Sequence, residues 1–492
     1  MKKIIYGIVV ALFCSGCDNF LEEYSQSQTV AKKVSHFDEV LLGDGYLPAQ
    51  NRAYISTDHA GFLNIMDDDV TTVGGSGLAV FFWPDCSVNL FGYYAWQLEV
   101  GRNPTGDVLR DDSQTWLDFY RRINVMNVIL KEIDDISVSS PSEELDRIRV
   151  KGECHFIRAS LYFTLVNLYG KAYNKATSAT DYGVPLKLTE YVEHDKDKKT
   201  QFERTPVAKI YEQIVEDLKT AVNYLTESPQ KRPLHRASKE AAQLLLSRVY
   251  LYMEEYDKAI TYADEAIKHP AFSLLDLNTH PKDKSFCSLS SPETLFSQRG
   301  TFMAYIHAND SLQGGSFARP TAIQTSNGYT TSENLLASYD DTDLRKEVFF
   351  VPHHIDKSTF RCLKVRELND DVVGEDHVIR LAEAYLNKAE AQAALGQDGE
   401  ARSTLRILLE KRYAPTDIPE LTESGAALVN YIREERRREL CYEGHRWFDL
   451  RRYAVNSKFP FTKAIEHKAY KYIKISDTEG NFREIGKYVL KP

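Results

Sequence analysis

A repeated spacing of large and small apolar residues points to packed pairs of helices. In residues 246–270, Leu246, Tyr250, Ala259 and Ala266 occupy facing positions on two consecutive helices. The small alanines are needed because two antiparallel helices cross closely at those positions. One such pair cannot bury its apolar face alone, so neighbouring pairs must stack on it. The sequence therefore predicts a mostly helical fold.

A second, more degenerate copy of this pattern covers residues 378–412, with Tyr385, Ala389 and Ala401 at the matching positions. Both copies have the spacing of a tetratricopeptide repeat. Apolar periodicity predicts further helices, with Ser142 as the cap of the second and Thr205 as the cap of the third. These helices cover residues 115–134, 145–170, 206–225 and 428–453. Helix pairs are therefore expected over about 115–270 and 378–453. Few short strands are expected, including a hairpin in the tail.

Two long segments, about 50–110 and 272–377, lack helical periodicity and are rich in glycine, serine and aromatic residues. Loops on a rigid scaffold often carry binding residues, so we expect a ligand-facing side here. Folding of these aromatics back onto the core is the equal alternative. The aromatic residues that we select as ligand-binding candidates are Trp83, Trp96, Tyr93, Tyr305 and Tyr329.

Two polar runs in the first loop-rich segment resemble ion-binding loops only superficially. Asp67-Asp68-Asp69 lacks the spacing and the terminal glutamate of a calcium loop, so we expect it to be a solvated loop. The glycines at 74–77 lack the lysine of a phosphate-binding loop. No metal or cofactor is predicted, and the sequence shows no serine-hydrolase, zinc-protease or dinucleotide-binding motif.

Net charge argues against a polyanionic partner. The chain of 492 residues carries a formal charge of −10, which gives no basic surface for nucleic acid. Aromatic residues make up 11% of the chain, a surplus that suits both carbohydrate binding and packed helical cores. Of the seven cysteines, two lie near the N-terminus, and Cys154 and Cys441 are expected to be buried in helices.

The N-terminus has the pattern of an export signal. Met1-Lys2-Lys3 is followed by an apolar run of about ten residues, too short to span a bilayer. Small residues then precede Cys17, as in a lipoprotein box, with Cys14 as a second candidate. We expect residues 1–16 to be removed, Cys17 to be acylated, and residues 17–492 to form one domain.

The stretch from Leu428 to Tyr453 concentrates arginines and carboxylates. Glu434, Glu435, Glu439 and Glu443 offset the arginines at 433 and 436–438, which argues against nucleic acid and for a structural ion-pair network. Gly444 is expected to end the first helix of this stretch.

This stretch also resembles a known family. Residues 435–440 and 442–452 closely resemble the hallmark of the SusD/RagB family, nutrient-capturing lipoproteins of Bacteroidetes, and residues 152–170 and 340–345 resemble further segments of it. The resemblance implies a SusD-like fold, anchoring in the outer membrane at the cell surface, and a SusC-like TonB-dependent transporter as partner. It also implies an oligosaccharide or other glycan as ligand and binding without catalysis. A binder of peptides or only of proteins and a surface glycoside hydrolase are the alternatives.

Overall fold

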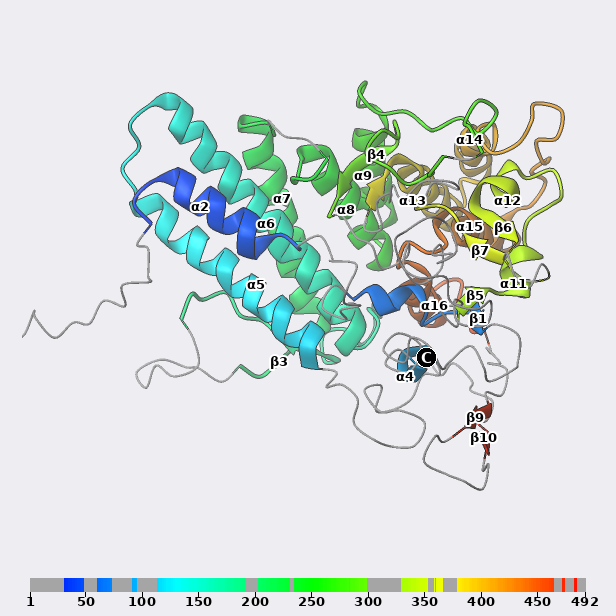
Figure 1. Ribbon diagram of the computed structural model, residues 1–492, viewed down its shortest axis with the longest axis horizontal. Coiled ribbons are helices and arrows are strands. Elements are labelled where there is room, and N and C mark those ends of the chain that lie inside the picture. Colours follow the sequence, from blue (N-terminus) through cyan, green and yellow to red (C-terminus); the bar gives the residue numbers. More distant parts are fainter. Residues whose placement is uncertain are drawn as a thin grey trace, which may run out of the picture.

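The fold is mostly helical, as the apolar spacing predicts (Figure 1). The computed structural model describes residues 31–47, 60–72, 91–94, 113–191, 202–230, 234–282, 284–298, 329–352, 358, 360–365, 378–463, 471–473 and 482–484. The longer helices are α2 (Val34–Val40), α5 (Ser113–Glu132), α6 (Pro141–Tyr169), α7 (Val207–Glu227), α8 (Lys239–Tyr252), α9 (Tyr256–Ile267), α13 (Leu381–Ala394), α14 (Asp398–Leu409), α15 (Gly425–Leu440) and α16 (Arg446–Ala454).

Short elements connect these helices. They include α4 (Phe91–Tyr94), α11 (Glu333–Leu336), α12 (Leu344–Phe349), the π-helix η1 (Leu41–Gly45) and the 3-10 helices η2 (Gly61–Asn64) and η3 (Ile133–Asp135). The strands are β1 (Val70–Thr72), β2 (Tyr182–Pro185), β3 (Arg204–Pro206), β4 (Thr294–Ser297), β5 (Tyr329–Thr331), β6 (Phe350–Pro352), β7 (Phe360–Cys362), β8 (Val378–Arg380), β9 (Lys471–Ile473) and β10 (Phe482–Glu484).

Consecutive helices pack as pairs, α6 with α7, α8 with α9 and α13 with α14, and α9 also packs on α13. Close packing depends on small residues at the crossings. Ala259 and Ala266 of α9 are fully buried, as their spacing predicts. At the α6–α7 crossing, a Cβ added to Gly152 would lie 2.9 Å from Cγ of Leu225, closer than van der Waals contact allows. Glycine is therefore required at position 152 for these two helices to approach.

Three helix boundaries differ from the sequence expectation. Ser140, not Ser142, caps α6: its Oγ accepts a hydrogen bond from the Glu143 backbone N at 3.2 Å, and Pro141 begins the helix. Pro206, not Thr205, is the N-cap of α7. The helix α15 ends at Leu440 rather than at Gly444, because the chain already turns at residue 441.

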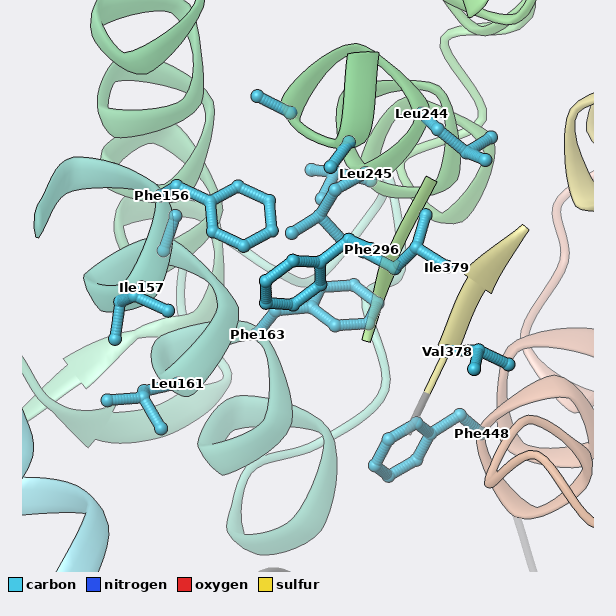
Figure 2. Packing of buried hydrophobic residues seen from close by; sticks show 14 of the residues in the cluster. Phe156, Ile157, Leu161, Phe163, Leu244, Leu245, Phe296, Val378, Ile379 and Phe448 are labelled. Carbon is cyan, nitrogen blue, oxygen red and sulfur yellow. The ribbon is translucent and has the colours of Figure 1, made fainter. Parts of the chain in front are cut away.

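The strands form only two-stranded antiparallel sheets in the described part of the chain. The pair β4–β8 bridges the two helix-pair regions, and β9–β10 is the hairpin predicted for the tail. Buried side chains from α6, α8, β4, β8 and α16 form one core at this bridge (Figure 2). The rings of Phe156 and Phe296 meet there edge to face with centroids 5.1 Å apart. Cys154 in α6 and Cys441 are buried free thiols, as expected, but Cys441 lies in the turn after α15 and not in a helix.

Candidate functional site

The two loop-rich segments of the chain meet at one small sheet. Strands β1 and β5 pair antiparallel, with Thr72 opposite Tyr329. Thr72 directly precedes residues 73–90, which belong to the first loop-rich segment. Tyr329 directly follows residues 299–328, which belong to the second. The Ser332 backbone N and Oγ extend this junction by donating to the carbonyl oxygens of Asp69 and Asp68, each at 2.8 Å. Segments that are more than 200 residues apart in sequence are thus joined at one place.

Most of the aromatic candidates lie outside the described residues. Trp83 belongs to the segment that joins β1 to α4, and Trp96 follows α4 by two residues. Tyr305 and the acylation candidate Cys17 also lie outside the described residues. Tyr329 is described for its backbone position in β5. These four aromatic positions all belong to segments that leave or enter the β1–β5 sheet or α4.

Tyr93 is the candidate whose side chain the structure describes. It lies in α4, is only 5% exposed, and stacks on Phe62 of η2 with ring centroids 4.1 Å apart and planes inclined by 16°. One face of its ring is therefore covered by the core. Trp83 and Trp96 remain the first candidates for stacking on a ligand.

The aspartate run is buried, contrary to the expectation of a solvated loop. Asp67, Asp68 and Asp69 are 2%, 7% and 0% exposed. Arg446 donates from Nε and Nη2 to the Asp68 carboxylate at 2.7 and 3.0 Å, and Nε of Arg437 donates to Asp69 at 2.6 Å. The arginines of the C-terminal stretch thus pair with acids almost 400 residues earlier in the chain, which local sequence cannot reveal.

The pKa values of Asp67 and Asp68 are shifted in opposite directions. Burial by itself would raise the pKa of Asp68, but the adjacent Arg446 and Arg437 hold that pKa well below its usual range. Burial raises the pKa of Asp67 well above its usual range, and the charges of Asp69 and Asp68 add to this effect. Among the residues described, no group of His, Cys, Asp or Glu side chains is arranged to hold a metal ion.

A second set of paired charges is centred on Glu439 of α15, which is completely buried. Its carboxylate accepts hydrogen bonds from Arg345 at 2.9 Å, from Arg380 at 2.7 Å, and from Arg412 at 2.8 and 2.9 Å. Burial by itself would raise the pKa of Glu439, but Arg412 and Arg380 outweigh it and hold that pKa well below its usual range. The predicted ion-pair network is confirmed, and it extends far beyond α15.

The turn between α15 and α16 ties this network to the β1–β5 sheet. Tyr442 has a left-handed backbone with φ 61°, and Gly444 has φ 74°. A left-handed tyrosine is unfavourable and persists only where its surroundings hold it. Here the Tyr442 hydroxyl donates to the carbonyl oxygen of Asp69 at 3.1 Å and also lies 3.0 Å from Oγ1 of Thr331.

These buried charges form one structural unit beneath the loop junction, which we call the ion-pair platform. Its cations are Arg345, Lys364, Arg380, Arg412, Arg437 and Arg446. Each of them pairs with a buried carboxylate. Sequence reasoning identified the arginines of α15 as members of an ion-pair network but missed Arg345, Lys364, Arg380 and Arg412. The available signal was the group of glutamates at 435, 439 and 443. Each of them needs a cation as partner when it is buried, so further cations had to be nearby.

The paired state of these groups suits a scaffold rather than a reactive centre. Each platform cation has its charge neutralised by a carboxylate. His155 of α6 likewise lies with Nδ1 2.7 Å from the Asp217 carboxylate, and Arg158 pairs with the same carboxylate at 2.6 Å. The platform therefore positions the β1–β5 sheet and does not itself offer free groups to a substrate.

Comparisons with known proteins agree with this architecture. The model of a family described as "Starch-binding associating with outer membrane" matches residues 93–251, and the SusD family model matches residues 367–488. A SusD-like protein of Formosa agariphila is 25% identical over 92% of this chain and 90% of its own length.

Solved structures share the fold. A SusD-like carbohydrate-binding protein of Bacteroides vulgatus superposes with a TM-score of 0.65 at 22% identity, covering 94% of this chain and 91% of its own. A SusD superfamily protein of Bacteroides thetaiotaomicron gives the same TM-score at 24% identity, covering 86% and 89%. A laminarin-binding SusD-like protein gives 0.58 at 20% identity, covering 86% and 90%.

None of the helices in the described part of the chain is long and apolar enough to cross a bilayer. The early helix pair and the C-terminal arginine stretch both fall within the matched ranges. With the hallmark at 435–452, the SusD-like fold and these matches taken together, the chain belongs to the SusD/RagB family.

Proposed function

We propose that this protein captures a glycan at the bacterial cell surface and passes it to a SusC-like TonB-dependent transporter in the outer membrane. The observation that carries the proposal is the junction at β1–β5, where both aromatic-rich segments of a SusD-family chain meet on a rigid base. Trp83 and Trp96 are the ligand-stacking residues of the proposal, followed by Tyr305, Tyr329 and Tyr93.

The proposed mechanism is binding without chemistry. Sugar rings present C–H faces that stack on aromatic rings, while polar loop side chains hydrogen-bond to hydroxyl groups. The platform supports this role because fixing the loops before binding reduces the entropy lost on association. The helix pairs would face the transporter, and the loop-rich side would face the glycan.

The test is a binding panel on the soluble form, residues 18–492, with plant, microbial and host glycans and with peptides. Isothermal titration should reveal one glycan class that binds. Each aromatic stacking contact is worth about 0.5–1.5 kcal/mol, so replacing both Trp83 and Trp96 with alanine should weaken binding by at least about fivefold. Unchanged affinity in this double variant would overturn the site assignment.

A matched control is available in a distant strand. Tyr182 in β2 is 70% exposed, and β2 pairs with β3, which Figure 1 shows well apart from β1 and β5. Tyr182→Ala removes an exposed ring without touching the proposed site and should leave glycan affinity unchanged. Peptide binding alone, or glycan hydrolysis lost on replacing a single carboxylate, would replace the proposed function with one of its alternatives.

The lipid anchor is tested separately. We propose that Cys17 is acylated, because small residues precede it after an apolar run. Cys17→Ala should move the full-length protein from the membrane fraction to the soluble fraction and abolish labelling by palmitate. Labelling that is retained in Cys17→Ala but lost in Cys14→Ala would reassign the anchor.

A further inference from the structure

A partly open cavity lies between the two helix-pair regions. Its volume is about 140 Å³, and α6, α8, β4, β8 and the start of α16 contribute to its lining. Among the described residues that line it, none belongs to β1 or β5, so the cavity is separate from the proposed stacking site. Since about 10–15 Å³ of such space holds one water molecule, the cavity suits a molecule the size of a single sugar ring.

The wall of this cavity is polar and apolar in nearly equal parts. The apolar part includes Phe156 and Phe296, whose rings meet edge to face at 5.1 Å, and Phe448 from α16 (Figure 2). The polar part includes Ser160, Thr164, Arg248, Gln298, Glu443 and His445. A sugar ring has the same mixture of C–H faces and hydroxyl groups, whereas a purely apolar molecule would leave polar wall groups without partners.

Arg248 of α8 has an unused edge of its guanidinium group. Its Nε and Nη2 donate to the Glu383 carboxylate at 2.5 and 2.6 Å, which fixes the side chain against α13. Nη1 has no hydrogen-bond partner among the described residues, and the side chain is 14% exposed where it lines the cavity. A guanidinium also forms a fork with a carboxylate through Nη1 and Nη2, so a second carboxylate can bind beside Glu383.

His445, the residue that precedes α16, adds a second donor to the same wall. Burial lowers the pKa of His445 well below its usual range, so the ring is neutral. Its Nδ1 lies 3.4 Å from Nη2 of Arg436, and since an arginine can only donate, Nδ1 is the acceptor. The ring proton is therefore on Nε2, which has no partner among the described residues and can donate to a ligand.

The charges around this wall favour an anion. The charges of Arg248 and Arg436 lower the pKa of His445 further, which shows that the ring lies in the field of cations. Glu443 is the acidic residue of the wall, and Arg380 and Lys364 neutralise it. The first turn of α16 adds the partial positive charge of a helix N-terminus.

We propose that this cavity binds an acidic sugar of one ring, a hexuronate. Its carboxylate would bind Arg248 and His445, its C–H face would lie against Phe296 and Phe448, and its hydroxyls would bond to polar wall groups such as Ser160. The inference goes beyond the proposed function, because the site uses neither Trp83 nor Trp96 and needs no transporter.

The experiment compares glucuronate, glucuronamide and benzoate by isothermal titration of the soluble form, residues 18–492. Glucuronamide keeps the shape of glucuronate but lacks its charge, and benzoate keeps the carboxylate but lacks the hydroxyls. Glucuronate should bind at one site, and each of the other two should bind at least about tenfold more weakly. Absence of glucuronate binding, or equal binding of glucuronamide or benzoate, would overturn the proposal.

The variant Arg248→Lys tests the anchor. A lysine can keep the pair with Glu383 but has no second fork, so glucuronate affinity should fall by about tenfold while the urea unfolding curve stays unchanged. Arg406→Lys is the matched control, because Arg406 is 54% exposed, pairs with Glu410 on α14 and does not line the cavity. Equal affinities in the two variants would contradict the role of Arg248.

Two further measurements locate the site. A crystal of the unaltered protein soaked with glucuronate should show the carboxylate within hydrogen-bonding distance of Arg248, and density only outside the cavity would contradict the proposal. The double variant with alanine at 83 and 96 should keep its glucuronate affinity. A loss there would place the uronate at the stacking site, whereas weak glycan binding with intact glucuronate binding would leave both sites as proposed.

Discussion

The helix pairs and the ion-pair platform keep distant parts of the chain together by opposite means. In α8 and α9 the contacts are apolar and small: Leu246 and Ala259 are fully buried, and consecutive helices meet through short connections. In the platform the contacts are charged and long: Glu439 alone binds Arg345 of α12, Arg380 of β8 and Arg412 of the turn after α14.

The difference reflects what each region has to join. Regular helices present continuous apolar faces, so burial of those faces is enough to hold them. Short strands and loops such as β1 and β5 have no such face, and arginine forks reach across several ångströms to fix them with directional bonds. The platform therefore orders irregular segments, at the cost of removing many charges from water.

The largest effect is expected from breaking the centre of the platform. Glu439→Ala leaves Arg345, Arg380 and Arg412 buried without their shared carboxylate and should lower the free energy of unfolding by about 3–5 kcal/mol. Urea denaturation measures this. Lys209→Ala is the control: it breaks an exposed pair with Glu212 and should change the free energy of unfolding by less than about 1 kcal/mol. Equal losses in the two variants would contradict the role of the platform.

A smaller effect is expected from overfilling the helix pair. Ala259→Leu adds bulk where α8 and α9 cross and should lower the free energy of unfolding by about 1–3 kcal/mol. Ile407 on α14 is 46% exposed, and Ile407→Ala serves as the control with a change within about 0.5 kcal/mol. No loss in Ala259→Leu would show that the crossing has room and that the alanine spacing is not a packing requirement.

These two regions also differ in how well sequence predicts them. The spacing of Leu246, Tyr250, Ala259 and Ala266 predicts α8 and α9 because helix pairing is local and periodic. The burial of Asp67–Asp69 was mispredicted, since the run looks polar and its partners, Arg437 and Arg446, lie almost 400 residues later. Pairing across such a distance leaves no periodic trace in the sequence.

The candidate ligand site is intermediate between these cases. The sequence selects Trp83 and Trp96 from their setting in glycine-rich stretches, and the structure adds the junction at β1–β5 from which the neighbouring segments depart. It also shows that Tyr93 packs on Phe62. Aromatic residues of the core and of binding loops can lie in sequence stretches of the same composition. Only their tertiary contacts distinguish the two.

A pH-dependent effect should arise from His445, at the turn before α16. Its folded pKa lies well below 6.5 because of burial and the charge of Arg248, so the unfolded chain binds a proton first as pH falls. Above pH 6.5 the histidine is neutral in both states and the stability is complete. Below pH 6.5 the free energy of unfolding should fall by up to about 1.4 kcal/mol per pH unit. His445→Gln should lose less stability than the unaltered protein between pH 6.5 and 5.5 in urea denaturation. Parallel losses would contradict the assignment.

The claim that the platform holds the loop junction is tested most directly by hydrogen–deuterium exchange in Asp68→Asn. This isosteric change removes the carboxylate shared by Arg446, Arg437 and Lys463. Exchange at the paired amides of β1 and β5 should accelerate by at least about tenfold, the effect of roughly 1.4 kcal/mol, while α8 and α9 keep their protection. Unchanged protection of β1 and β5, or equal acceleration in α8 and α9, would contradict the account.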